Sequence, residues 1–542
     1  MKYLYICCGL CVLLACSKTF EKEPLERITD DLVFDNIDKN ADYAKQFLYG
    51  TYAQLPDGYN RLSGAFLDAG TDDGLHSQDG NSIENFRNGR INALNVVDNQ
   101  WSRNYTGIRR ANMFLSKIDR VPADSALKSQ WKAEARFLRA YFYFELLKRW
   151  GGVPLLGDKV LGLNDNLNLP RNTADEVLQY ITSELDAIRS SLLPAVLADK
   201  DWGRANLGAA LALKARVLLY AASPLLNPAN AADKWQLAAN AARDVMQLNA
   251  YSLNADFIAL FNAVKNTEII FMLQKAQSQT LESNNGPVGY LVGSGLTSPS
   301  QNLVDAFLMR NGKLITDPTS GYDADKPYTN RDSRLDATIL YNGKNWLARP
   351  VETFEGGQDK PGGSRVQTKT GYYLRKFMGK FESSASYSNQ NHHVILFRYA
   401  EVLLNYAEAL NEAQGPVKEV FDAMVAIRKR AAITAGTDNL YGLPANATKA
   451  QMRELIQNER RIELAFEEHR FWDIRRWKLA ETVMNTPVKG MRIQKTGTNQ
   501  FTYTVFDAAP SVFDASKMYW LPIPFSEIQT NPNMRQNPGW SY

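Results

Sequence analysis

The stretch AEARFLRAYFYFELLKRWGGVP, residues 133–154, has the most regular helical pattern in the chain. Its apolar and aromatic residues recur at steps of three and four, which places them on one face of a helix: Ala133, Phe137, Ala140, Tyr141 and Phe144. Gly151 and Gly152 end this helix, and Pro154 prevents its continuation. The pattern therefore predicts a helix over residues 131–150 with one buried face.

Similar helical patterns occur along much of the chain. Thr173 opens one segment with Glu176 three residues later, which is the spacing of an N-terminal capping box. The segments with helical periodicity, each 16 to 21 residues long, are 173–193, 204–222, 233–248, 397–413, 417–432 and 449–468. Paired helices with alanines at their crossing points predict tetratricopeptide-like hairpins, although no regular repeat of about 34 residues is present. We expect a mainly α fold, an α-α superhelix, with hairpins mainly in residues 100–250 and 397–482.

Two segments lack this periodicity, residues 68–99 and residues 279–391, and both are rich in Gly, Ser, Asn and Asp. The second segment is too long for a structureless connection inside a compact domain. Its seven tyrosines and Trp346 argue against disorder. Because ordered loops on a rigid scaffold commonly carry binding residues, we expect these segments to form a large loop-rich ligand-binding region.

The N-terminus has the layout of an export signal. Lys2 is the only charge before a run of apolar and small residues that is too short to span a bilayer. The run ends with Leu-Leu-Ala-Cys at residues 13–16, which resembles the lipobox cleaved by the bacterial lipoprotein signal peptidase. An ordinary secretory signal is the alternative.

The lipobox resemblance implies a signal peptide over residues 1–15, acylation of Cys16, a lipidated tether over 16–27 and a domain over 28–542. Attachment by two or more acyl chains would be stable. All the cysteines lie in the leader: Cys7, Cys8, Cys11 and Cys16. We therefore expect no disulfide, thiolate metal site or cysteine nucleophile in the folded domain.

Composition excludes several classes of function. Hydrophobic residues make up 45% of the 542 residues, so a large core is expected. The net charge of +4 gives no strong attraction to nucleic acid, and we expect no such partner. Histidines, the usual zinc ligands and proton shuttles, are scarce: His76, His392, His393 and His469. We expect neither a metal nor a cofactor.

The segment NERRIELAFEEHRFWDIRRW, residues 458–477, carries many acidic and basic side chains at helical spacings. One interpretation is a hydrogen-bonded ion-pair network buried at a helix junction. The alternative is a catalytic carboxylate pair, as in a surface glycoside hydrolase. Each acid here has an arginine within one turn, which favours the structural interpretation.

Four segments in this order resemble the SusD/RagB family of surface lipoproteins: 133–154, 397–410, 458–477 and 521–540. Residues 101–115 and 331–346 show shorter likenesses. The resemblance implies a non-catalytic lipid-anchored protein of the outer membrane, built on helical hairpins, that acts as a lid on a TonB-dependent SusC-like transporter. Its ligand would be an oligosaccharide or a peptide. A helical scaffold that binds only other proteins is the further alternative.

A sugar-binding site needs aromatic platforms for the C–H face of the ring and polar groups for its hydroxyls. The candidate platforms in the loop-rich segments and beside them are Trp101, Tyr290, Tyr322, Tyr328 and Trp346, with Phe86 as a further aromatic. The candidate polar partners are Asp72, Asp73, His76, Asn85 and Arg87. Core packing is the alternative for Trp101 and Trp346, and a turn is the alternative for Asp72 and Asp73.

Residues 310–380 hold 13 Lys or Arg against 8 Asp or Glu. An acidic glycan would use such an excess, but an ordinary solvated surface shows it equally.

Overall fold

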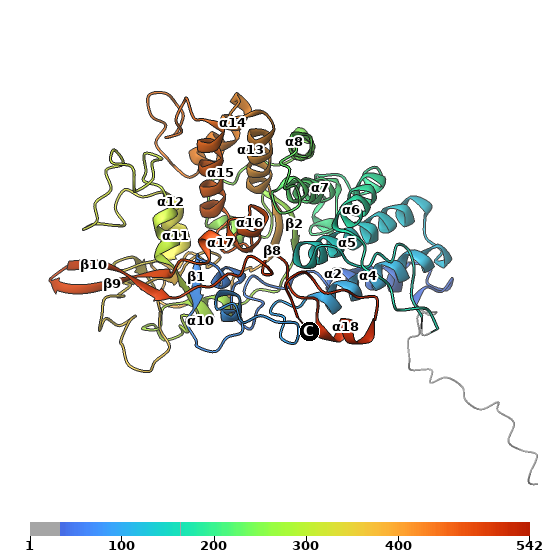
Figure 1. The fold of residues 1–542 in the computed structure, drawn as a ribbon, viewed down its shortest axis with the longest axis horizontal. Coiled ribbons are helices and arrows are strands. Elements are labelled where there is room, and N and C mark those ends of the chain that lie inside the picture. Colours follow the sequence, from blue (N-terminus) through green and yellow to red (C-terminus); the bar gives the residue numbers. More distant parts are fainter. Residues whose placement is uncertain (1–32, 163, 542) are drawn as a thin grey trace, which may run out of the picture.

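The computed structural model describes residues 33–162 and 164–541, which form a mainly helical molecule (Figure 1). The expected signal peptide, the expected tether over 16–27 with Cys16, and the first five residues of the expected domain lie outside the described residues. The long helices are α2 (Asp42–Tyr52), α4 (Trp101–Lys117), α5 (Ser125–Trp150), α6 (Ala174–Ile188), α7 (Leu207–Ala222), α8 (Ala232–Gln247), α13 (Tyr399–Gln414), α14 (Lys418–Arg430) and α15 (Lys449–Glu463).

Shorter elements fill the remainder. The short helices are α3 (Glu84–Arg87), α9 (Ala259–Asn262), α10 (Thr280–Asn285), α11 (Gln301–Ala306), α12 (Ser333–Thr338), α16 (Arg470–Arg476), α17 (Ala480–Val483) and α18 (Phe525–Thr530). The strands are β1 (Gly74–His76), β2 (Ile269–Leu273), β3 (Thr297–Pro299), β4 (Ile339–Leu340), β5 (Asn345–Trp346), β6 (Arg349–Pro350), β7 (Tyr373–Leu374), β8 (Val394–Arg398), β9 (Val488–Gly497) and β10 (Gln500–Ala509). The strands pair antiparallel, two by two: β1–β3, β2–β8, β4–β7, β5–β6 and β9–β10.

Helix α5 contains the predicted buried face but begins earlier than predicted. The Asp124 carboxylate accepts hydrogen bonds from the N–H groups of Ala126 and Leu127 at 2.8 and 3.2 Å, so the helix starts at Ser125 rather than at residue 131. It ends where Gly151 takes a φ of +71°, a conformation that favours glycine.

The helices stack as successive neighbours, confirming the predicted hairpins. Helices α4, α5, α6 and α7 each contact the next helix along the chain (Figure 1). Helix α8 then contacts α13, and α13 contacts α14 and α15. Helices α4 and α5 cross closely at Gly107, where a Cβ would collide with the ring of Phe142. The mainly α, tetratricopeptide-like fold is therefore confirmed.

The predicted helix over residues 449–468 is wrong at its C-terminal end. Helix α15 stops at Glu463, because Phe466 and Glu468 both take a φ of +62° and turn the chain before α16. This turn brings Glu463 and Glu467 to the same buried cation. The Arg398 guanidinium lies 2.7 Å from each of their carboxylates.

A buried ion-pair network joins this turn to the loop-rich half. Arg398 also pairs with Glu268 at 2.7 Å, and Arg334 pairs with Glu459 at 2.6 Å. All of these side chains are buried. The structural interpretation of residues 458–477 is therefore confirmed, because their carboxylates are neutralised by fixed arginines.

The two loop-rich segments are ordered and lie together. Strand β1 of the early segment pairs with β3 of the late one, with Leu75 opposite Ser298. A hydrophobic core separate from that of the helices packs under the late segment. The β9–β10 hairpin projects at the edge of this half (Figure 1). Within the described part of the chain, no helix has both the length and the apolar character required to cross a membrane.

Candidate ligand-binding site

Trp101 and Trp346, two of the expected sugar platforms, are core residues. Trp101 is 4% exposed and packs edge-on against Trp150, with ring centroids 5.0 Å apart. Trp346 is fully buried, and its indole N–H donates to the Tyr387 hydroxyl at 2.9 Å. Neither ring offers a face to a ligand, so the packing alternative holds for both.

Asp72 and Asp73 hold the early loop against α15 and α16. Arg470 donates two hydrogen bonds of 2.9 Å to Asp72, and Arg461 donates one of 2.7 Å to each aspartate. Burial alone would raise the pKa of Asp72, but these two arginines outweigh it and the pKa lies below its ordinary value. Both carboxylates are buried and paired, and their expected role as sugar partners is corrected to a structural one.

The three candidate tyrosines differ in what they expose. Tyr290 is 8% exposed, and the Arg349 guanidinium lies over its ring, 3.6 Å from the centroid. Tyr322 and Tyr328 are half-buried. One face of Tyr328 stacks on Tyr341 with centroids 4.2 Å apart. Arg331 lies over the Tyr322 ring, 5.6 Å from its centroid. Tyr322 and Tyr328 are therefore partly exposed residues whose rings have protein contacts, whereas Tyr290 is buried beneath Arg349.

His76 lies on β1 and is 2% exposed. Its Nδ1 accepts a hydrogen bond from the Gln78 N–H at 3.2 Å, and its Nε2 has no partner within the described residues. Burial, together with the charge of Lys369, lowers the pKa of His76, so the ring is neutral at physiological pH.

A groove of about 540 Å³ opens where three chain segments meet. The early loop supplies one wall, Lys369 of the late loop-rich segment supplies another, and the end of β10 supplies the third. The lining residues are Leu75, Asp79, Glu84, Arg87, Asn88, Arg90, Lys369, Ala508, Ala509, Pro510 and Val512. Of the residues that we expected at a site from the sequence, this groove contains Arg87; His76 does not line it.

Short-range bonds tie the three walls together. The Val512 N–H donates to the Arg87 carbonyl at 2.7 Å, and the Arg87 guanidinium donates to the Pro510 carbonyl. Across the groove, the Lys369 ammonium lies 2.6 Å from Asp79 and 3.3 Å from Glu84. The groove is therefore a built feature rather than a gap between independent loops.

The cations of the groove differ in their partners. Lys369 is paired with both acids, as described above. Arg87 is 6% exposed, makes no ion pair with any described residue, and leaves its Nε without a hydrogen-bond partner. Burial lowers the pKa of Arg87, but a guanidinium stays protonated at neutral pH. Arg90 is exposed, and its side chain has no partner among the residues that the structure describes.

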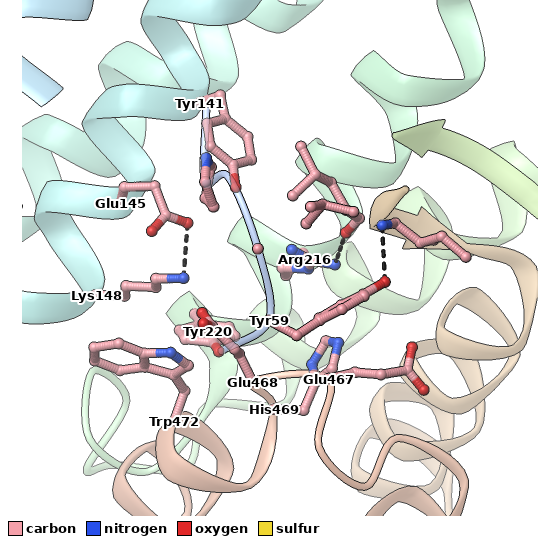
Figure 2. Close-up of a pocket in the computed structure, with 15 residues that line it drawn as sticks. Tyr59, Tyr141, Glu145, Lys148, Arg216, Tyr220, Glu467, Glu468, His469 and Trp472 are labelled. Carbon is pink, nitrogen blue, oxygen red and sulfur yellow. Dashed lines mark hydrogen bonds and ion pairs between the residues drawn. The ribbon is translucent and has the colours of Figure 1, made fainter. Parts of the chain in front are cut away.

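A second cavity lies deeper, where α5 faces the turn between α15 and α16 (Figure 2). Figure 2 shows Tyr141, Glu145 and Lys148 of α5 across the space from His469 and Trp472. Its volume is about 50 Å³, enough for a few water molecules at about 10–15 Å³ each. Lys148 and Glu145 pair with each other at 2.7 Å. This cavity is too small for a sugar ring.

Two further grooves of about 480 Å³ lie among the helices, one beside Arg136 and Glu184 and one beside Trp235 and Trp477. The groove at the early loop is the candidate site because the two loop-rich segments form two of its walls.

Sequence reasoning missed most of the groove. Arg90 follows Arg87 by three residues, a spacing that could have drawn attention to the pair. Lys369 and the residues after β10 carry no local signal, because tertiary packing alone brings them to the early loop. Within the described residues, no three His, Cys, Asp or Glu side chains are grouped as potential metal ligands.

Comparison with known proteins independently supports the family resemblance seen in the sequence. Residues 267–540 match the model of the SusD family, and residues 42–219 match a model described as starch-binding and associating with the outer membrane. SusD-like protein P38 of Formosa agariphila is 27% identical over 503 residues, which cover 89% of this chain and 92% of that protein.

Solved structures agree with the sequence relatives. A SusD-like protein from Bacteroides fragilis superposes with a TM-score of 0.78 at 27% identity, over 94% of this chain and 98% of the other. A second structure from that organism, described as a SusD-like carbohydrate-binding protein, gives a TM-score of 0.77 at 27% identity, over 91% and 98% of the two chains. With its helical hairpins, its loop-rich half and a family model matched over half its length, this chain belongs to the SusD family.

Proposed function

We propose that this chain is a lipoprotein of the outer membrane that binds oligosaccharides and delivers them to a TonB-dependent transporter, on which it acts as a lid. One matched family model is described as starch-binding and associating with the outer membrane, which supports both the ligand class and the location. A structural relative at 27% identity is described as carbohydrate-binding. The groove between the early loop, Lys369 and β10 is the observation that carries the binding site.

The groove suits a short segment of an oligosaccharide. Its volume falls within the roughly 300–1,000 Å³ that small-molecule sites usually occupy. Val512, which is 52% exposed, supplies apolar surface for the C–H face of a sugar ring. Arg87, Asn88 and Arg90 supply N–H donors for its hydroxyl groups.

The groove is poorly equipped for hydrolysis, although it contains two carboxylates. A glycosidase needs one carboxyl that keeps its proton, and therefore a raised pKa. The side chain of Asp79 is 92% exposed, and the hydrogen bond from Lys369 lowers its pKa. This direction is opposite to that of a proton donor, so we propose binding without catalysis.

Isothermal titration against a panel of oligosaccharides tests the binding proposal, with peptides as a parallel panel. Ala508→Trp places a large side chain in the groove and should abolish binding of a glycan that the native protein binds. Val505→Trp on the same strand is the matched control, because Val505 is 48% exposed and does not line the groove. Equal affinities for both variants would place the site elsewhere. Release of reducing ends from a bound glycan would contradict the non-catalytic proposal.

Two further experiments test the membrane and transporter parts of the proposal. Cys16→Ser should move the protein from the membrane fraction to the soluble fraction and prevent labelling with radioactive palmitate. Affinity purification of the native protein from membranes should recover a SusC-like transporter. Retention of Cys16→Ser in the membrane would contradict the lipid anchor, and recovery without a transporter would contradict the lid.

A further inference from the structure

The groove contains two arginines, Arg87 and Arg90, that make no ion pair with any described residue, although the charge of Glu84 acts on Arg87 at longer range. Its third cation, Lys369, lies between Asp79 and Glu84 and is fully compensated. Arg87 and Arg90 have no carboxylate within ion-pair distance in residues 33–162 and 164–541. Many buried arginines of the molecule are paired, as Arg398 is with three carboxylates, although Arg331 and Arg475 are also buried without an ion pair to any described residue.

Arg87 is the more informative of the two because it is buried. One arm of its guanidinium donates to the Pro510 carbonyl, which fixes the orientation of the side chain. Its Nε–H has no partner, and a buried cation without a counter-ion is energetically unfavourable. An anion in the groove would lie beside this guanidinium and supply the opposite charge.

Arg90 adds a second guanidinium at the same rim. It lies three residues after Arg87, beyond α3, and its side chain is exposed and unpartnered among the described residues. Guanidinium groups bind carboxylates and sulfates through paired, charge-assisted hydrogen bonds. Neutral sugar hydroxyls need donors and acceptors, but they do not need two uncompensated cations.

We propose that the groove recognises an anionic group on the glycan, either the carboxylate of a uronic acid residue or a sulfate ester, through Arg87 and Arg90. This inference rests on the proposed function and names the chemical class of its ligand. Lys369 plays no part in holding the anion, because its ammonium is already engaged by two carboxylates.

Matched pairs of ligands test the inference by isothermal titration. An oligogalacturonide is compared with its methyl ester, and a sulfated galactan oligosaccharide is compared with its desulfated form. We expect binding of at least one acidic member, with its neutral counterpart about tenfold weaker or more. The acidic member that binds tells whether the anion is a carboxylate or a sulfate.

Arginine variants connect the preference to the groove. Arg87→Gln and Arg90→Gln should each weaken binding of the acidic ligand by about tenfold or more, and both should reduce its salt dependence. Arg310→Gln is the matched control, because Arg310 is an exposed arginine of the late loop-rich segment that does not line the groove. Thermal unfolding shows whether Arg87→Gln still folds. If it does not, exposed Arg90 decides the question alone.

The possible results separate this inference from the proposed function. Equal affinity for acidic and neutral members, or unchanged affinity in Arg90→Gln, would overturn the anionic preference and leave oligosaccharide binding intact. No binding to any glycan of either panel would contradict the proposed function itself.

Discussion

Replacing Arg398 by Met tests whether the buried network holds the helical and loop-rich halves together. The guanidinium of Arg398 lies 2.7 Å from each of Glu268, Glu463 and Glu467, and its side chain is 2% exposed. Removing one partner of a buried ion pair typically lowers the free energy of unfolding by about 3–5 kcal/mol. We expect a loss in this range, because Met fills similar space but leaves these carboxylates short of a cation.

The loss of stability in Arg398→Met should depend on pH, and the pKa values of Glu463 and Glu467 determine the direction of this dependence. Burial alone would raise the pKa of Glu463 and Glu467, but the surrounding cations outweigh it and hold both pKa values below the ordinary value of 4.5. A group whose pKa is lowered by folding adds stability above its unfolded pKa and loses it as pH falls through the folded pKa. Without Arg398 both pKa values rise, so the carboxyls can take up protons on mild acidification.

Urea unfolding at neutral pH and at about pH 4, below the ordinary glutamate pKa of 4.5, measures the effect. The difference between the native protein and Arg398→Met should be largest at neutral pH and should shrink on acidification. Arg310→Met, at an exposed arginine outside the network, should leave stability unchanged at both pH values. A difference that is independent of pH would refute the electrostatic reasoning, since lost packing alone does not titrate.

Three further predictions follow from packing and pairing. Gly107→Leu should lower the free energy of unfolding, as measured in urea, by about 1–3 kcal/mol, because the leucine side chain would collide with the Phe142 ring where α4 crosses α5. An unchanged free energy of unfolding would show that the two helices can move apart. Asp72→Asn should lower the free energy of unfolding by about 3–5 kcal/mol, because it removes the carboxylate that Arg470 binds with two hydrogen bonds. Calorimetry on the folded protein should find its glycan affinity unchanged. Weaker binding would identify Asp72 as a ligand contact. Trp346→Ala should cost about 3–5 kcal/mol in thermal or urea unfolding, again without a change in the glycan dissociation constant; an intact fold with lost binding would identify the ring as a platform after all.

Local periodicity was sufficient to predict the helical half. The apolar face of α5 and the capping box of Thr173 with Glu176 depend on residues at most one turn apart. The end of α15 was not predictable in this way. Its chain turns at Phe466 and Glu468, where φ is positive. The Arg398 guanidinium that pairs with Glu463 and Glu467 lies 65 and 69 residues earlier, so no local pattern reveals this contact.

The candidate site was less accessible to sequence reasoning than the fold. An aromatic residue can be a sugar platform or a core residue, and its type does not tell which. The sequence therefore suggested Trp346 as a platform, although its ring is fully buried. Acidic type likewise does not reveal that Asp72 is neutralised by arginines nearly 400 residues later. Arg87, a ligand-binding candidate from the sequence, lines the groove, but its lack of an ion-pair partner became visible only in three dimensions.

The hydrogen bond from the Val512 N–H to the Arg87 carbonyl has a consequence for biogenesis. One wall of the groove is made early in synthesis and the opposite wall close to the C-terminus. Because synthesis starts at the N-terminus, the proposed binding groove cannot form until almost all of the chain has been translated. A nascent or prematurely terminated copy would therefore be empty, however well its first helices had already folded.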